Sequence, residues 1–359
     1  MTKQTPSCLV AMSGGIDSSV AAYLLAQSGE ACVGATMRLY QNEDIGLREK
    51  TCCSLDDVED ARAVAAQLHI PYYVFDFSGA FRENVMDRFV SAYEQGITPN
   101  PCIDCNRHLK FAALFDRAMQ MGCEKVATGH YVRIAQEGGR FVLKKALDPD
   151  KDQSYVLYSL TQEQLTHTVF PLGELTKPEV RRIAAEQGFF NAEKAESQDI
   201  CFVPDGDYAR FIETYAGKRF PSGDFLSVDG KVLGRHRGII HYTVGQRRGL
   251  GIAAETPLYV VRIDPKANTV ILGENKDLFS RALTAHDVNL VAVPEICGEL
   301  RCKAKIRYRH QEQPCTVTMP DADTLRVTFD EPQRAITAGQ SVVLYDGDTV
   351  LGGGVIAAE

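Results

Sequence analysis

The sequence contains no apolar run of the ~18 residues that a membrane-spanning helix needs, so no segment of it is predicted to cross a bilayer. The stretch from Met1 to Pro6 lacks both the apolar core of a signal peptide and an arginine-rich transit helix. Basic residues are the minority, 39 against 47 acidic ones, and the net charge of −8 argues against a general affinity for nucleic acid. Tryptophan is absent, which excludes nothing. We expect a cytoplasmic protein that meets any polyanion through a local basic patch.

The eleven cysteines include one Cys-x-x-Cys pair and no second one, which argues against a structural zinc site. Disulfide frameworks are disfavoured in the cytosol, so most of these thiols are expected to be free. Six lie in apolar or alternating segments and are interpreted as packing residues: Cys8, Cys32, Cys123, Cys297, Cys302 and Cys315. The others lie in polar, turn-forming surroundings and are candidates for chemistry: Cys52, Cys53, Cys102, Cys105 and Cys201.

The chain of 359 residues is long enough for two or three domains, and its pattern changes class along its length. Its first half alternates strands and helices, which predicts an α/β, doubly wound parallel sheet of the Rossmann-like type. Beyond about residue 220, short alternating runs and Asp-Gly turns predict two small β-rich, barrel-like domains. We therefore expect domains over 1–215, 216–281 and 282–359.

Apolar periodicity and turn signals place the individual elements of the first half. Ser54 and Asp57 are expected to form a capping box. Helices are predicted over about 18–28, 55–69, 80–94, 107–120 and 177–187, and strands over 31–40, 72–75 and 125–128.

Residues 13–19, Ser-Gly-Gly-Ile-Asp-Ser-Ser, follow an apolar run and precede a helical pattern. A strand, a glycine turn and a helix start form the geometry that binds phosphate through backbone N–H groups and the helix dipole. No Lys-Ser/Thr pair closes the loop, so it is not the Walker type. The plainer interpretation is a serine-capped helix after a Gly-Gly turn. The strand–helix context favours the phosphate site.

The segment 98–111 contains two prolines and is expected to be an extended loop followed by a helix. Cys105 is predicted at the start of that helix, beside Arg107, His108 and Lys110. A helix N-terminus and nearby cations favour the thiolate, so a lowered thiol pKa is expected there. Cys102 and Cys105 could instead be half of a zinc site, a redox pair or two thiols without a role.

A second cysteine, Cys201, lies in the polar run 196–202 before a Pro-Asp-Gly turn, which predicts a mobile loop with an exposed thiol. Two cysteines in such settings suit sulfur transfer, in which one carries a persulfide and the other helps to release its sulfur.

Five cations occupy every second position of the run 301–310: Arg301, Lys303, Lys305, Arg307 and Arg309. Strand periodicity places all of them on one face, with Cys302, Ala304, Ile306 and Tyr308 on the other. In an acidic protein this stripe predicts a binding site for RNA phosphates, although a solvated strand face is the plainer alternative. The runs 235–238 and 246–249 add basic loops to the middle of the chain.

In this order along the chain, these motifs resemble the tRNA-specific 2-thiouridylases, a family with a pyrophosphate-type loop. The resemblance extends through residues 128–131, 150–155, 241–250 and 338–341, so it covers nearly the whole chain. It implies an enzyme that uses ATP to adenylylate O2 of the wobble uridine in tRNA anticodons and replaces that oxygen with sulfur from a cysteine persulfide. Its implied partners are tRNA and a sulfur donor, such as a cysteine desulfurase or a sulfur-relay protein.

The resemblance also implies roles for residues of this chain. Positions matching the ATP site are Ala11, Met12, Ser13, Gly14, Gly15, Ile16, Asp17, Ser18, Met37 and Gly129. Cys105 matches the catalytic nucleophile, Cys201 the persulfide carrier, and Asn100, Pro101 and Cys102 the triplet that contacts the target base. Positions matching tRNA contacts are His130, Lys151, Asp152, Gln153, Arg307, Tyr308 and Gln340.

Two details concern cofactors. Asp17 would favour a magnesium ion beside the ATP phosphates. Many family members carry aspartate where this chain has Cys102, so Cys102, Cys105 and Cys201 could together hold an iron–sulfur cluster in place of persulfide chemistry.

Two other functions fit parts of the sequence. Another pyrophosphate-loop ligase, of the argininosuccinate or amidotransferase type, would act on a small molecule and would need neither the cysteines nor the basic strand. A nucleotide-gated RNA-binding or sulfur-carrier protein would need no catalysis. Pyrophosphate release that depends on added tRNA separates these alternatives.

Overall fold

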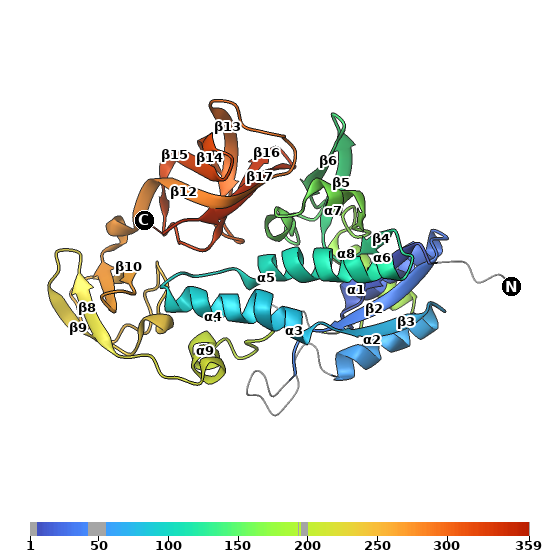
Figure 1. Cartoon of the computed structure of the whole chain (residues 1–359), viewed down its shortest axis with the longest axis horizontal. Helices are drawn as coiled ribbons and strands as arrows, with labels where there is room; N and C mark the ends of the chain where they lie inside the picture. Colours follow the sequence, from blue (N-terminus) through green and yellow to red (C-terminus); the bar gives the residue numbers. More distant parts are fainter. Residues whose placement is uncertain (1–5, 42–54, 193, 195–199, 359) are drawn as a thin grey trace. The chain divides into compact units, whose positions relative to one another are not determined.

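The computed structural model describes residues 6–41, 55–192, 194 and 200–358 (Figure 1). The predicted cap at Ser54, and Cys52 and Cys53, lie outside these residues. Backbone contacts divide the chain into two compact units, each assembled from several segments. The first unit comprises 1–85, 102–206 and 347–351, and the second comprises 86–101, 207–346 and 352–359.

The first unit is built on a parallel sheet, as the alternating pattern predicts. Its strand order is β3-β2-β1-β4-β7, so the chain reverses direction across the sheet between β1 and β4. The strands are β1 (Cys8–Ala11), β2 (Cys32–Arg38), β3 (Tyr72–Asp76), β4 (Lys125–Ala127) and β7 (Thr168–Val169).

Alternation of side chains along β1 builds a core on each face of this sheet. Cys8 and Val10 pack into a cluster with Val20, Val64 and Val180, which come from the helices of one face. Leu9 packs on the other face, with side chains of the segment 114–126. The helices are α1 (Ile16–Gln27), α2 (Leu55–Gln67), α3 (Ser78–Phe81), η3 (Cys105–Ala113), α6 (Leu114–Gln120), η4 (Ser154–Leu157), α7 (Gln162–Thr166) and α8 (Lys177–Glu186).

A β-hairpin follows β4 in the chain and extends the first unit. Its strands, β5 (Val132–Glu137) and β6 (Arg140–Lys145), are antiparallel. The first residues of β17 (Thr349–Ile356) pair with β6, where Thr349 faces Lys144. The hairpin is secured there by Arg133, which donates to Asp348 Oδ2 over 2.8 Å.

The second unit contains the two β-rich parts that the turn signals predict. One is a four-stranded sheet in the order β10-β11-β8-β9. Its strands are β8 (Gly223–Ser227), β9 (Val232–His236), β10 (Tyr259–Asp264) and β11 (Thr269–Gly273). The helices of this unit include α4 (Asp87–Glu94) and α9 (Tyr208–Ala216), and Phe89 of α4 packs on Phe211 of α9.

The other β-rich part is a closed barrel in the order β12-β15-β14-β13-β16-β17, in which β12 also pairs with β17. Closure removes the exposed edges of the sheet. Its strands are β12 (Phe279–Leu290), β13 (Leu300–Lys305), β14 (Gln313–Asp321), β15 (Thr324–Arg334), β16 (Ser341–Asp346) and β17.

Four further short helices lie in the described residues: η2 (Arg82–Met86), α5 (Pro101–Asp104), η5 (Ile239–His241) and η6 (Asn275–Leu278). In the described residues, no helix combines the length and apolarity needed to cross a membrane.

Candidate active site

The loop between β1 and α1 leaves the backbone N–H groups of a helix start without a side-chain cap. α1 begins after Gly15, and no side-chain hydrogen bond caps its N-terminus. Ser18 closes the loop internally, since its Oγ accepts from Ser13 N over 3.1 Å and donates to Gly15 O over 3.0 Å. The free N–H groups at the N-terminus of a twelve-residue helix favour an anion such as the phosphates of ATP. The plainer interpretation, a serine-capped helix, is wrong.

Two glycines are required here because other chain segments press against the loop. Gly14 has a φ of +74°, and a Cβ placed on it would lie 2.4 Å from Asp57 O. A Cβ on Gly129, just beyond β4, would lie 2.8 Å from Ser18 N. Gly14 and Gly129 therefore line the loop with bare backbone, which fits the roles that the sequence predicts for them.

The other residues matched to the ATP site form or flank this loop. Ala11 ends β1 and Met12 follows it, and Met12 O accepts from Thr36 Oγ1 over 2.6 Å. Met37 lies one residue further along β2 and is half-buried. Ile16 is buried in the core that α1 shares with the sheet. The predicted ATP residues thus gather at the carboxyl ends of β1, β2 and β4, where parallel sheets bind their ligands.

Asn191 supports the loop and was not predicted from the sequence. Its Nδ2 donates to Gly14 O over 3.0 Å and to Ser19 Oγ over 2.9 Å. Its Oδ1 is buried and has no hydrogen-bond partner in the structure. A buried amide whose oxygen is unpaired is costly, so Asn191 marks a place where a bound group could supply a donor. A lone asparagine far along the chain gives no sequence signal for this role.

Asp17 is engaged by two residues that sequence reasoning also missed. Lys177 Nζ and Tyr131 Oη each lie 2.7 Å from Asp17 Oδ1. The Lys177 side chain is only 7% exposed, and its ammonium lies 5.8 Å from the centre of the Tyr131 ring. A lysine ammonium therefore occupies the side of the loop where the sequence predicts magnesium.

The segment that carries Cys102 and Cys105 is helical from Pro101 onwards, so the predicted helix start near residue 107 is wrong. Proline fits the first position of a helix because the missing N–H has no partner there in any case. Cys102 lies in the first turn and is exposed, and Cys105 lies one turn later and is buried. Cys105 opens the π-helical segment η3, a geometry that is frequent at functional sites.

The thiol pKa predicted to be low at Cys105 is in fact high, so this expectation is also wrong. Burial raises the pKa of Cys105 to about 11, and the ammonium of Lys110 opposes the rise only in part. The reason is that a buried thiolate loses more hydration than one nearby cation returns. Asn106, the next residue, donates to Val156 O over 2.9 Å, and its buried Oδ1 has no partner.

His130 connects the end of β4 to the cysteine helix. Its Nδ1 lies 2.6 Å from Thr128 Oγ1, and its Nε2 lies 3.4 Å from Lys110 Nζ. Burial, and to a smaller extent the charge of Lys110, holds the pKa of His130 well below its usual value, so the ring is neutral. A neutral ring accepts from the ammonium at Nε2 and donates at Nδ1. His130 is only 8% exposed and positions Lys110.

Cys201 follows the residues 195–199, which lie outside the described part of the chain. It is half-buried, and its carbonyl accepts from Tyr40 Oη over 2.6 Å. The neighbouring Phe202 packs edge-on against Phe81, which also contacts Tyr40. An aromatic cluster therefore anchors Cys201 beyond the carboxyl end of β2.

The three cysteines do not form a ligand set for a metal. Cys102, Cys105 and Cys201 are all described, and among the described residues no three His, Cys, Asp or Glu side chains are grouped to hold an ion. An iron–sulfur cluster does not fit these three cysteines as they lie.

The loop that carries the predicted base-contacting triplet is joined to Gln340 within the second unit. Gln340 Nε2 donates to Thr98 O over 2.9 Å and to Pro99 O over 3.3 Å. Thr98 N in turn donates to Ala338 O over 3.0 Å. Asn100 and Pro101 follow directly, so Gln340 fixes the backbone just before the triplet.

The segment 151–153 is tied into its own surroundings. Asp152 accepts from Ala146 N over 3.1 Å and from Ser154 Oγ over 2.7 Å. Gln153 Oε1 accepts from Tyr131 N over 2.9 Å, next to the Asp17 site. Lys151 is half-buried in the same turn.

The basic stripe of the C-terminal barrel is shorter than the sequence predicts. β13 ends at Lys305, so Arg307 and Arg309 lie in the following turn and not on one strand face. Arg301 is paired with Asp330 through contacts of 2.7 and 2.8 Å. Tyr308, expected on the apolar face, is 40% exposed. Basic residues continue to occupy every second position up to Arg309, although the strand ends at Lys305 and the backbone then turns.

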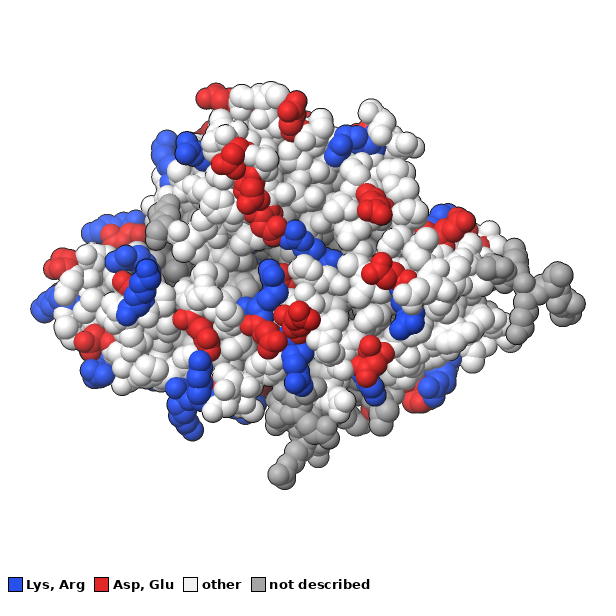
Figure 2. Space-filling view, viewed as in Figure 1, with Lys and Arg blue, Asp and Glu red and all other residues white. Residues whose placement is uncertain are grey.

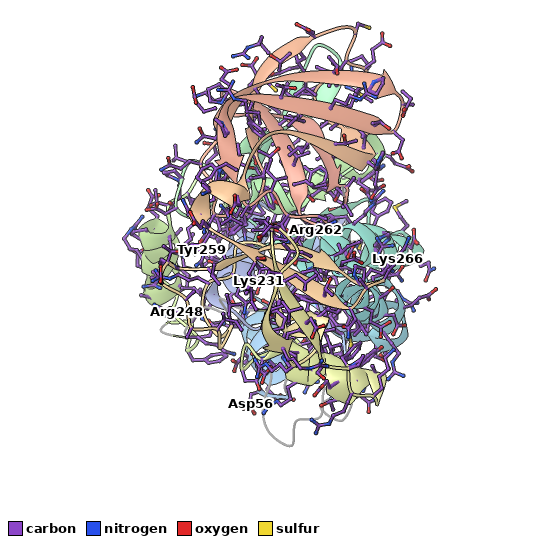
Figure 3. All side chains as sticks on the ribbon, turned by 90° about the vertical axis from the view of Figure 1, so that its left-hand side faces the viewer. Asp56, Lys231, Arg248, Tyr259, Arg262 and Lys266 are labelled. Atoms are coloured by element: carbon purple, nitrogen blue, oxygen red, sulfur yellow. The ribbon has the colours of Figure 1, made fainter. Side chains whose placement is uncertain are left out.

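Charge on the molecular surface is otherwise mixed. On the face drawn in Figure 2, described basic and acidic side chains are interspersed. In the middle β-sheet, Arg235 pairs with Asp224 at 3.2 Å. Figure 3 labels further cations of this part of the chain, Lys231, Arg248 and Arg262.

Comparisons with known proteins show the family of this chain. Family models match residues 7–205 (tRNA methyl transferase HUP domain), 209–274 (tRNA methyl transferase PRC-barrel domain) and 280–356 (aminomethyltransferase beta-barrel domain). The chain is 50% identical to the tRNA-specific 2-thiouridylase MnmA of Clostridioides difficile over 97% of each chain. It is 51% identical to the protein of that name from Lachnoclostridium phytofermentans, over 97% of this chain and 98% of the relative. This chain therefore belongs to the tRNA-specific 2-thiouridylase family.

Proposed function

We propose that this protein is a tRNA-uridine 2-sulfurtransferase, which uses ATP to replace O2 of the anticodon wobble uridine with sulfur. One observation carries the proposal. The N-terminus of α1 has no side-chain cap and adjoins the bare backbone of Gly14 and Gly129, and it lies in the same unit as the Cys105 thiol. A small-molecule ligase would need the first feature but not the cysteine helix.

ATP is proposed to bind with its phosphates on the loop 13–18. The N–H groups of the first turn of α1 would bind phosphate oxygens, and Ser13, which is exposed, would offer its hydroxyl. Attack of the uridine O2 on the α-phosphorus then forms an adenylylated uridine and releases pyrophosphate. Lys177 and the helix start supply positive charge beside the departing pyrophosphate.

We also propose that Asp17 holds a magnesium ion, although its Oδ1 already has two partners. Lys177 and Tyr131 both use Oδ1 of Asp17, so a magnesium ion would bind through Oδ2 or replace the lysine. When bound, the ion would neutralise charge on the phosphates. In the structure, these two contacts of Asp17 order the first turn of α1.

Sulfur is proposed to arrive as a persulfide on Cys201, formed by a sulfur donor such as a cysteine desulfurase or a relay protein. The terminal sulfur attacks C2 of the activated uridine, and AMP leaves with the original oxygen. Cys105 then attacks the Cys201 sulfur as a thiolate, which breaks the S–S bond and releases 2-thiouridine. A Cys105–Cys201 disulfide remains, and a thiol reductant must return both cysteines to the reduced state.

tRNA is proposed to contact the protein through Arg307, Tyr308 and the loop at Asn100. Arg307 and Tyr308 lie in the turn after β13, and Tyr308 is exposed. Four further proposed tRNA contacts are Lys151, Asp152, Gln153 and His130. Hydrogen bonds within the protein also give Asp152, Gln153 and His130 a supporting role. We also propose that the protein works in the cytoplasm.

The test measures pyrophosphate release and 2-thiouridine formation with an unthiolated tRNA, ATP, a persulfide donor and dithiothreitol. We expect pyrophosphate release only when tRNA is present, and loss of 2-thiouridine in Cys105→Ser and Cys201→Ser. Cys297→Ser, which changes an exposed cysteine of the barrel, is the matched control. Pyrophosphate release with a small molecule alone would favour the ligase. Activity that requires bound iron and acid-labile sulfide would favour the cluster.

A further inference from the structure

Two cysteines of the C-terminal barrel face each other across neighbouring strands. Cys302 of β13 and Cys315 of β14 are direct partners in the antiparallel register. Their Sγ atoms lie 3.7 Å apart. Cross-strand neighbours in antiparallel sheets have the Cα separation that a disulfide needs, so the bond could form with a small rotation of the side chains.

The two thiols of the pair differ in solvent exposure and in pKa. Cys315 is fully buried, whereas Cys302 is half-buried. The Cys315 thiol lies within bonding reach of both Cys302 Sγ and Cys302 O, at 3.7 Å each. A hydrogen bond from Cys315 and the neighbouring Arg301 guanidinium lower the pKa of Cys302. Cys302 is thus the thiol that an oxidant can reach and that ionises first.

We propose that Cys302 and Cys315 are a redox-active pair, which a peroxide converts into a reversible disulfide. The Cys302 thiolate attacks one peroxide oxygen, breaks the O–O bond and becomes a sulfenic acid, with one water released. The Cys315 sulfur then attacks the sulfenic sulfur, and a second water leaves. Two thiols lose two electrons and two protons, and one hydrogen peroxide becomes two waters. A dithiol reductant reverses the change.

The bond would link β13, which precedes the turn that contains Arg307 and Tyr308, to β14, which follows it. Because the two strands are already paired, it would change the folded state little and would mainly restrict the unfolded chain. The expected consequence is a rise of several degrees in the Tm of the oxidised protein, reversed by dithiothreitol.

The chain provides its own control for this chemistry. Cys8 and Cys32 are also direct partners, in the parallel register of β1 and β2. Both are buried, and burial raises the pKa of Cys32 to about 11 and that of Cys8 further. A cross-strand position alone therefore does not make a reactive pair, and we expect these two thiols to stay reduced.

The experiment treats the reduced full-length protein with a small excess of hydrogen peroxide, alkylates the remaining thiols and digests with a protease that cleaves after glutamate. Cleavage after Glu299 and Glu312 places Cys302 and Cys315 in the separate peptides 300–312 and 313–359, because Pro332 protects the bond after Glu331. A linked peptide lighter than the sum of the two by the mass of two hydrogens is the expected product. Cys8 and Cys32 fall in peptides 1–30 and 31–43 and should both be alkylated.

Cys302→Ser and Cys315→Ser should each abolish the linked peptide and the reversible rise in Tm. Unchanged circular dichroism of the reduced variants shows that they fold. The exposed Cys297, in peptide 296–299, reports that the oxidant has acted. The proposal is overturned if Cys297 is oxidised while Cys302 and Cys315 are still alkylated. It is also overturned if Cys302 is found linked to Cys297 and not to Cys315.

Discussion

Lys177 Nζ lies 2.7 Å from Asp17 Oδ1 and joins the first residue of α8 to the first turn of α1. The backbone N–H of Lys177 also donates to Asp148 Oδ2 over 2.9 Å, so the lysine is fixed at both ends. This pair connects the loop 13–18 to a helix 160 residues away in the sequence. These contacts restrain a loop to which two glycines give more backbone freedom.

We predict that Lys177→Met lowers tRNA-dependent pyrophosphate release at least tenfold and destabilises the fold by about 1–3 kcal/mol. The variant leaves the Asp17 carboxylate, whose side chain is only 32% exposed, without its charged partner. Pyrophosphate release and urea unfolding measure the two effects. Lys144→Met, which breaks the 2.6 Å pair with Glu137, is the control and should leave activity unchanged. Equal activity of both variants would contradict a role for Lys177 at the loop.

The sequence predicts the glycine loop between β1 and α1 because all of its signals are local. An apolar strand, two glycines and a helical period lie within about twenty residues, and each has one physical meaning. Lys177, Tyr131 and Asn191 were missed as supports of the loop, because only tertiary packing brings them to Asp17 and Gly14. Their own sequence surroundings are those of ordinary helix and turn residues.

The cysteine helix shows where local reasoning gives the wrong answer. Pro99 and Pro101 indicate an extended loop, yet Pro101 is the first residue of the helix. Cys105 is therefore one turn inside, where burial outweighs the neighbouring cations. Burial depends on what the helix packs against, and composition around Cys105 does not reveal it.

Gly14→Ala should abolish pyrophosphate release and lower stability. Its Cβ would meet Asp57 O at 2.4 Å and would also strain a backbone with a φ of +74°. Gly29→Ala separates these two causes, because Gly29 has a φ of +82° and nothing within 4 Å of its Cβ position. We expect Gly29→Ala to cost about 1 kcal/mol in unfolding free energy and to keep full activity. If Gly29→Ala is equally inactive, general strain rather than the loop contact is the cause.

The rate of sulfur release should rise with pH. The reactive form of Cys105 is the thiolate, and its pKa is raised to about 11, so the thiolate fraction grows about tenfold per pH unit from 7 to 9. Single-turnover formation of 2-thiouridine, with saturating ATP and preformed persulfide, measures this dependence. Lys110→Met should lower the rate at neutral pH, because it removes the charge that opposes the rise in pKa. Lys110→Arg should restore part of it. A rate independent of pH would exclude the Cys105 thiolate from the limiting step.

Binding of tRNA should depend on salt through the turn after β13. We expect Arg307→Ala with Arg309→Ala to weaken binding and to reduce the slope of log affinity against log salt by about one to two, at roughly 0.7–0.9 per phosphate contact. Arg301→Ala is the matched control, since its guanidinium is paired with Asp330 at 2.7 and 2.8 Å and is not available to phosphate in this arrangement. Titrations of unthiolated tRNA at several salt concentrations measure both slopes. If Arg301→Ala alone flattens the slope, the strand face and not the turn contacts the tRNA.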